Sequence, residues 1–204
     1  MRWLALYLRS RGAFAAFAVA VGAIALVWGA WSWFSDARTV NARAVTLTVM
    51  LGVAAFARTL GGPDGDLDRT GAVRWPLRRF VHVLVLGAVI VGLLMPTLLT
   101  GARFEPAAMV LRNTAGLLGL TALGAALVGA ALCWVAPLTW TVVSVLPFLD
   151  ASPKVGIQIA GWLVQPTDTE VATACAVILA VAGLAVNSWR GGPRAPKAET
   201  APAS

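Results

Sequence analysis

Long stretches of this chain carry no charged residue, and this feature decides what the chain can fold into. One such stretch covers residues 12–34 and another covers residues 113–149. Hydrophobic residues make up 59% of the sequence and charged residues only 12%. A soluble domain has roughly 25% charged residues, because water must wet its surface. The sequence therefore predicts a chain embedded in a lipid bilayer, with no sizeable soluble domain.

The length of the chain limits the number of times it can cross a membrane. A helix needs ~20 residues to cross ~30 Å of hydrocarbon, which allows at most about six crossings with short loops. The apolar runs are long and do not alternate with polar residues, so helices are predicted rather than barrel strands. The predicted fold class is an all-α polytopic membrane protein with six transmembrane helices. An N-terminal interfacial helix precedes them, and a re-entrant or outer helical segment separates helices five and six.

Residues 1–11 form the predicted interfacial helix, which precedes a transmembrane domain at 12–189. On a helical wheel Trp3 and Tyr7 lie on one side, and Arg2 and Arg9 lie on the other. The alternative is a positively charged extension of the first span. A secretory signal is disfavoured because the apolar run exceeds a ~7–15-residue core and ends in tryptophans rather than small residues.

Six apolar segments fit the predicted spans. Charged, aromatic, glycine or proline residues bound most of them, as expected at membrane interfaces and in loops. The predicted spans are 12–34, 42–60, 80–100, 113–135, 138–149 or beyond, and 171–186.

The fourth and fifth spans share one charge-free run, so their boundaries depend on local signals. Asn113 is predicted to cap the fourth span, and a turn near Ala136 and Pro137 is predicted to separate it from the fifth. Small residues recur at helical spacing on the fourth span. We expect this face to pack within the chain, with a dimer contact as the alternative. Its members are Ala115, Gly119, Ala122, Ala126 and Gly129 or Ala130.

The predicted outer segment covers residues 152–165. Ser152 followed by Pro153 has the order of an N-cap and a first helical residue. The helix that they would start, residues 155–164, is too short to cross a bilayer and is predicted to be re-entrant or to lie at the outer surface. Thr167 and Glu170 then form a predicted capping box that starts the sixth span.

The basic residues predict the orientation. Most arginines fall on the side of the two termini, which places both termini in the cytoplasm of a bacterial plasma membrane. All of the 16 basic residues except Lys154 and Lys197 are arginines, which is typical of a GC-rich bacterium. They lie at the ends of apolar runs, where they indicate topology and lipid headgroup contacts rather than nucleic-acid binding. The tail at 190–204 is rich in proline and alanine and is predicted to be disordered.

Few residues offer catalytic chemistry. His82, the only histidine, lies about one turn into the third span, whereas Asp150 and Asp168 lie near the opposite surface. Neither H-E-x-x-H nor a P-loop is present. Cys133 and Cys175 lack metal-ligand spacing and are predicted to be buried thiols. The chain is predicted not to be an enzyme, and no cofactor or metal site is predicted within it.

The most distinctive polar segment is the cytosolic loop between the second and third spans, residues 61–79. An acidic residue and arginine, then Thr-Gly, an apolar stretch and Pro-x-Arg are compatible with a brief amphipathic helix at the membrane surface. The alternative is a solvated, positively charged loop that only fixes topology. The residues singled out in this loop are Asp68, Arg69, Thr70, Arg74, Trp75, Pro76 and Arg78.

This layout resembles the membrane subunits of type-2 ATP-binding-cassette exporters, particularly short actinobacterial forms. In that family an interfacial helix precedes six spans, a coupling helix between spans two and three inserts into a separate ATPase, and a re-entrant outer segment precedes the last span. Residues 1–11, 61–79 and 152–165 fall in those places. The family's acidic-Arg-x-Gly signal is similar to Asp68-Arg69-Thr70-Gly71, and its Pro-x-Arg to Pro76-Leu77-Arg78. This chain differs in its small size and short second span.

The resemblance implies a permease subunit of an ABC transporter, an exporter, in the bacterial cell membrane. A separate ABC ATPase subunit would bind ATP and Mg, and the loop residues singled out above would couple to it. A second permease copy or a homologous permease would complete the pathway. One alternative is a non-transporting integral membrane protein such as an immunity, scaffold or assembly factor. Another is a small intramembrane enzyme that uses His82 with an acidic side chain.

Overall fold

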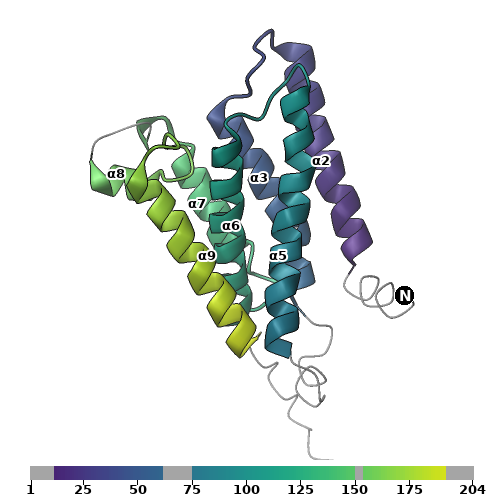
Figure 1. Cartoon of the computed structure of the whole chain (residues 1–204), viewed down its shortest axis with the longest axis vertical. Coiled ribbons are helices and arrows are strands. Elements are labelled where there is room, and N and C mark those ends of the chain that lie inside the picture. Colours follow the sequence, from purple (N-terminus) through teal and green to yellow (C-terminus); the bar gives the residue numbers. More distant parts are fainter. Residues whose placement is uncertain (1–11, 62–74, 150–153, 192–204) are drawn as a thin grey trace, which may run out of the picture.

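The computed structural model describes residues 12–61, 75–149 and 154–191, and the regular elements in these ranges are helices. They form an elongated bundle (Figure 1). Within the described ranges, extended backbone pairs in an isolated β-bridge between Thr39 and Arg103. The Val40 amide donates to the Arg103 carbonyl at 2.8 Å, so this bridge ties two loops together at the upper end of the bundle.

Five helices among the described residues are long and apolar enough to cross a membrane. The chain is therefore an all-helical membrane protein, as the sequence predicts. Predicted spans one, two, three and six each match one of these helices to within a few residues. The five are α2 (Ala13–Phe34), α3 (Ala42–Ala57) continued by the 3-10 turn η1 (Arg58–Leu60), α5 (Trp75–Leu94) continued by η2 (Met95–Leu99), α6 (Ala107–Leu127) and α9 (Glu170–Arg190).

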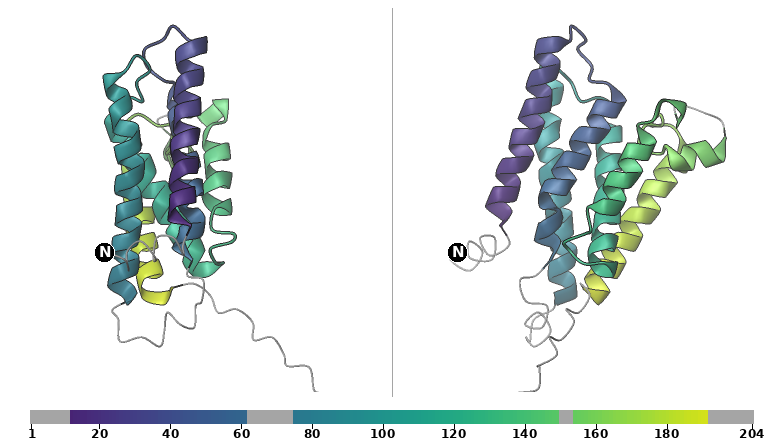
Figure 2. Two further views of the ribbon diagram at one scale, coloured as in Figure 1. Left: turned by 90° about the vertical axis from the view of Figure 1, so that its right-hand side faces the viewer. Right: turned by 180° about the vertical axis from the view of Figure 1, so that it is seen from behind.

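Successive helices run in alternating directions (Figures 1 and 2). In Figure 1 α2 and α5 run upward, whereas α3, α6 and α9 run downward. The start of α2, the connection from α3 to α5 and the end of α9 therefore lie toward the lower end.

The two ends of the bundle differ in charge. We call the lower end of Figure 1 the basic end, because its charged residues within the described ranges are all arginines. These are Arg58, Arg78, Arg79 and Arg190. At the upper end, which we call the mixed end, both acidic and basic residues are present. The acidic members are Asp36, Glu105, Asp168 and Glu170.

Between α6 and α9 the chain returns through three short elements: α7 (Val135–Ser144), the 3-10 turn η3 (Pro147–Leu149) and α8 (Val155–Ala160). The 10 residues of α7 rise about 15 Å, which is about half the thickness of the hydrocarbon core. The stretch expected to form the fifth span thus contains no single helix of spanning length in its described part. Ser152 and Pro153, the predicted cap, lie outside the described residues.

The predicted boundaries of the fourth span are wrong. α6 begins six residues earlier than expected, after Pro106, so Asn113 lies inside the helix and caps nothing. The turn after α6 also comes before Ala136, because α6 ends at Leu127 and α7 begins at Val135. Gly129 has a φ of +94° in this turn, a conformation that favours glycine.

Two further local predictions are wrong. The helix expected at 155–164 ends at Ala160, because Gly161 lies against the η3 turn and a Cβ there would be 2.7 Å from the Leu149 carbonyl oxygen. The capping box does not form either. Thr169, rather than Thr167, occupies the N-cap of α9, and its side chain makes no capping hydrogen bond.

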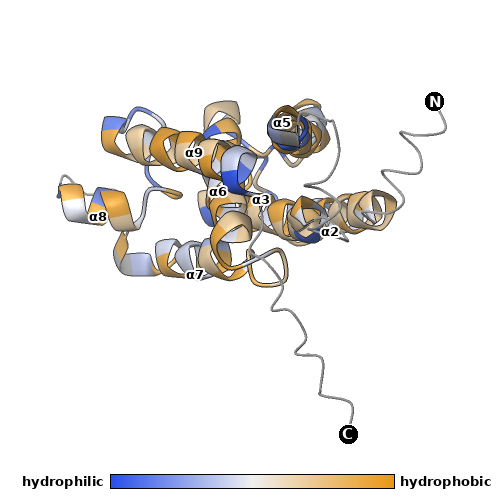
Figure 3. Cartoon of the chain, turned by 90° about the horizontal axis from the view of Figure 1, so that it is seen from below, coloured by the Kyte–Doolittle hydropathy of each residue, from blue (hydrophilic) through white to orange (hydrophobic). Residues whose placement is uncertain are grey.

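α6 is the central helix of the bundle. Within its most apolar window 72% of the residues are buried, compared with 17% for α2 and 22% for α9. The outward faces of the peripheral helices are apolar (Figure 3), and large side chains such as Leu26 and Ile178 are exposed there. Exposed apolar surface of this extent is expected where lipid rather than water surrounds the helices.

α6 and α9 approach closely enough for their backbones to touch. A Cβ added to Gly183 would clash with the backbone of Gly119, and one added to Gly119 would lie 2.5 Å from Cα of Ala180. Glycine therefore permits this crossing, as small residues do between helices in lipid. The expectation that the small-residue face of α6 packs within the chain is confirmed at Gly119, whereas Ala115 on the same face is exposed.

Candidate functional site

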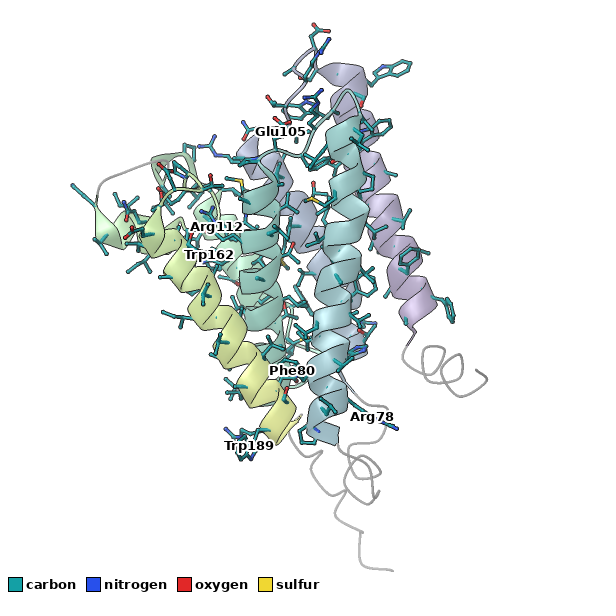
Figure 4. All side chains as sticks on the ribbon, viewed as in Figure 1. Arg78, Phe80, Glu105, Arg112, Trp162 and Trp189 are labelled. Atoms are coloured by element: carbon teal, nitrogen blue, oxygen red, sulfur yellow. The ribbon has the colours of Figure 1, made fainter. Side chains whose placement is uncertain are left out.

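The structure describes only part of the predicted coupling loop. Asp68, Arg69, Thr70 and Arg74 lie outside the described residues. Trp75, Pro76 and Arg78 belong to the first turn of α5, which therefore begins inside the segment assigned to the loop. Arg78 is exposed and its side chain points away from α9 at the basic end (Figure 4). The predicted interfacial helix, residues 1–11, also lies outside the described residues.

The best-defined polar site within the described residues lies instead in the interior, near the mixed end. It joins α3, α6 and the turn that follows α8. Asn113 of α6 is fully buried, and its amide nitrogen donates to Oγ1 of Thr46 at 3.0 Å and to the Leu163 carbonyl at 2.8 Å. The Thr46 hydroxyl donates to the same carbonyl at 3.2 Å. One carbonyl oxygen thus holds two helices and a turn together.

Arg112 extends this site toward the turn after α8. Its guanidinium donates from Nη2 to the Gln165 carbonyl at 2.7 Å and from Nη1 to the Pro166 carbonyl at 3.0 Å. Only 7% of the residue is exposed. Its Nε also donates to Oδ1 of Asn113 at 3.4 Å, so two of its three hydrogen-bond partners are backbone oxygens more than 50 residues away in sequence. We call Thr46, Arg112, Asn113 and the residues 163–166 that they bind the polar cluster.

Further hydrogen bonds attach the α7 side of the bundle to the same turn. Nε1 of Trp140 and the hydroxyl of Ser144 both donate to the Ala160 carbonyl, at 3.1 and 3.0 Å. The Gln165 side chain donates to the Leu149 carbonyl at 3.0 Å. Trp162, which is fully buried, packs against Gly116 of α6, close to Arg112 (Figure 4). These hydrogen bonds and the polar cluster therefore fix the return segment between α6 and α9 onto α6.

The sequence did not predict this cluster, because Arg112 was expected in a loop and Asn113 at the cap of the fourth span. A charged residue beside a long apolar run usually marks the end of a span. The available signal was Pro106, since a proline before an uninterrupted run of good helix formers is compatible with a helix start at Ala107. That start places Arg112 and Asn113 in the second turn.

His82 lies in the first half of α5. Its Nε2 lies 3.3 Å from the Thr59 hydroxyl, near the basic end. Among the described residues, no three His, Cys, Asp or Glu side chains come together as metal ligands would.

Cys133 lies in the turn between α6 and α7, outside the spanning helices. It is fully buried, and its thiol donates to the Ala130 carbonyl at 3.3 Å. Burial raises the pKa of Cys133 to about 11, because desolvation disfavours the thiolate. The prediction of a buried thiol is confirmed for Cys133, whereas Cys175 on α9 is only partly buried.

We expect alkylation of Cys133 by iodoacetamide to be slow at neutral pH and to accelerate toward pH 11, because the thiolate is the nucleophile. The folded-state pKa lies above the unfolded value of about 8.5. Stability contributed by the thiol is therefore complete below about pH 8.5 and is lost as the pH rises through 11. Mass spectrometry of a Cys175→Ala variant measures the rate. Rapid alkylation at pH 7 would contradict the buried position.

Comparisons with known proteins give no relative for this chain: no family model, no curated protein and no solved structure matches it.

Proposed function

We propose that this chain is the membrane-spanning permease subunit of an ABC transporter, an exporter energised by a separate ATPase. The observation that carries this proposal is the placement of two irregular segments. The connection from α3 to α5 leaves from the basic end, whereas the α7–η3–α8 return approaches the start of α9 near the mixed end. The resemblance drawn from the sequence requires a coupling segment and an outer segment on opposite faces of the membrane.

In this proposal α7 and η3 make the remaining crossing, the fifth along the chain, and 152–165, which includes α8, is the outer segment. An even number of crossings leaves residues 1–11 and 190–204 on the same side as the basic end. The excess of basic residues on that side, counted along the whole sequence, supports a location in the cytoplasm of a bacterial plasma membrane.

The partners follow from the same proposal. An ABC ATPase subunit docks on the cytosolic loop, holds ATP and Mg, and hydrolyses the nucleotide. The coupling residues are Asp68, Arg69, Thr70, Arg74, Trp75, Pro76 and Arg78. A second permease copy or a homologous permease completes the pathway within the bilayer, and nucleic acid is not a partner.

The test reverses two charges of the loop. The tagged chain is purified from its native membrane after mild cross-linking, and P-loop ATPases in the eluate are quantified by mass spectrometry. We expect an ABC ATPase in the wild-type eluate and its loss in Arg69→Glu/Arg78→Glu. Arg38→Glu/Arg103→Glu, which reverses two charges at the mixed end, is the matched control and should retain it. An ATPase retained by the first pair would end the coupling role.

A second candidate is a non-transporting scaffold or assembly factor. The observation that favours it is the backbone contact of α6 with α9 at Gly119 and Gly183, together with the polar cluster, since both oppose relative movement of helices. If the wild-type chain purifies with membrane proteins but with no ATPase, this candidate replaces the first.

A further inference from the structure

We propose that the groove between α5, α6 and α9 binds an acyl chain of an anionic phospholipid, whose phosphate is held by arginines at the basic end. The groove has a volume of about 310 Å³, within the usual range of ligand sites. Five residues of α5 between Val83 and Val91 and five of α6 between Leu111 and Gly119 line it, together with Ala180 and Leu184 of α9. α6 forms its floor.

The lining fits a hydrocarbon chain. All the side chains that line the groove are apolar except that of Thr114, and small residues such as Ala88 and Ala115 leave the space between the helices open. Both alanines are exposed on the outer face of the bundle, so lipid has access from the side. An apolar groove that opens onto the bilayer is filled by lipid chains unless another helix covers it.

The charge at the mouth of the groove determines which lipid is favoured. Arg79 lies four residues before Val83 and eight before Gly87, so it continues the groove-facing row of α5 toward the basic end. Its guanidinium lies beside Gly191 at the end of α9, where a Cβ would be 2.5 Å from Nη1. Arg190, the residue before Gly191, is exposed. Arginine pairs with phosphate through charge-assisted hydrogen bonds.

The depth of the groove agrees with this assignment. Val83 and Val91 lie four and twelve residues beyond Arg79, which corresponds to about 6 and 18 Å along the helix. One leaflet of hydrocarbon is about 15 Å deep. Phe80 and Trp189 are exposed toward the basic end (Figure 4), and aromatic residues commonly mark the headgroup region. The arginines therefore lie at headgroup level and the groove lies at acyl-chain level.

Two hydroxyls near the groove have no hydrogen-bond partner. Thr114 is 2% exposed and lines the groove, and its Oγ1 is unpaired. Ser188 lies four residues beyond Leu184 on α9, one turn nearer the basic end, and its Oγ is also unpaired. An acyl chain forms no hydrogen bond with Thr114. Replacing Thr114 therefore tests whether an apolar or a polar group occupies the deep part of the groove.

The experiment uses the purified full chain in a neutral detergent. Dioleoylphosphatidylglycerol and dioleoylphosphatidylcholine are added at equal concentration, and bound lipid is read by native mass spectrometry. We expect phosphatidylglycerol to be retained preferentially. Arg79→Gln/Arg190→Gln should weaken its binding about tenfold or more, and Arg38→Gln at the mixed end should not. Equal retention of the two lipids by the wild type would overturn the proposal.

Groove variants separate the acyl site from general charge effects. Ala88→Leu/Ala115→Leu fills the groove from its lipid-facing edge and should release the lipid, whereas Ala18→Leu on the outer face of α2 is the matched control. Thr114→Val should leave binding unchanged, and a loss there would instead indicate a polar occupant. Millimolar inorganic phosphate should not displace the lipid. Displacement would show that the site binds only the phosphate group, and the proposal of an acyl-chain site would be wrong. These outcomes do not depend on whether an ATPase partner exists.

Discussion

Alanine in place of Gly183 is expected to lower the free energy of unfolding by about 3 kcal/mol, the largest effect that we expect from a single added methyl group among the described glycines. The added Cβ would meet the carbonyl oxygen of Gly119 and lie 2.5 Å from its carbonyl carbon. These atoms belong to the helix backbone and cannot rotate away, so α6 and α9 must separate. The loss is measured by titrating the purified protein with SDS in mixed micelles and following the helical signal.

The matched control is alanine at a helix glycine that touches nothing. A Cβ on Gly22 of α2 or on Gly92 of α5 would have no heavy atom within 4 Å. Gly22→Ala and Gly92→Ala should therefore be neutral or stabilise by up to about 1 kcal/mol, since alanine is the better helix former. If Gly183→Ala behaved like these two variants, the close crossing of α6 and α9 would be wrong.

Replacing Arg112 with methionine is expected to destabilise the fold by about 2–3 kcal/mol. The variant keeps an unbranched side chain in α6 but leaves the buried Gln165 carbonyl without the donor at 2.7 Å. Hydrogen bonds from a charged donor are worth about 1.5–3 kcal/mol each, and the relief of a buried charge offsets part of the two that are lost. We further expect earlier proteolysis after residue 160 in Arg112→Met, because the return segment loses its attachment to α6.

Arg103→Met is the matched control for this variant. Arg103 pairs with Glu105 at 3.7 Å at the mixed end, and both side chains are more than 40% exposed. An exposed ion pair contributes at most about 1 kcal/mol, so its loss should be small. Equal destabilisation by Arg103→Met and Arg112→Met would show that the buried hydrogen bonds of Arg112 contribute no more to stability than an exposed ion pair does.

The sequence predicts the helical membrane fold and most of the spans because lipid imposes a simple requirement. Backbone groups must be paired within a helix, and about 20 apolar residues must surround them. Residues 12–34 and 42–60 meet this requirement between polar loops, and the structure places helices there with almost the same bounds. The tryptophans at the end of α2 are a similarly local signal, because tryptophan marks the membrane–water interface whichever helices α2 packs against.

The α6–α7 region could not be read in the same way. Residues 113–149 contain no charge, so hydropathy does not distinguish a turn from a helix there. The turn depends on the positive φ of Gly129, a position that the spacing of small residues assigns to a helix face. The position of Arg112 depends on carbonyl oxygens more than 50 residues away, and only the tertiary structure brings these to it. A local pattern contains no information about such partners.

The opposite placement of the two ends of the bundle is the claim on which the permease proposal depends, and cysteine labelling tests it most directly. Single cysteines are introduced in a Cys133→Ser/Cys175→Ala background and treated in intact cells with a membrane-impermeant maleimide. Asp36→Cys and Lys154→Cys at the mixed end should react from outside. Arg58→Cys and Arg190→Cys at the basic end should react only after the membrane is opened. Reaction of Asp36→Cys and Arg190→Cys from the same side would contradict the arrangement and remove the cytosolic docking surface with it.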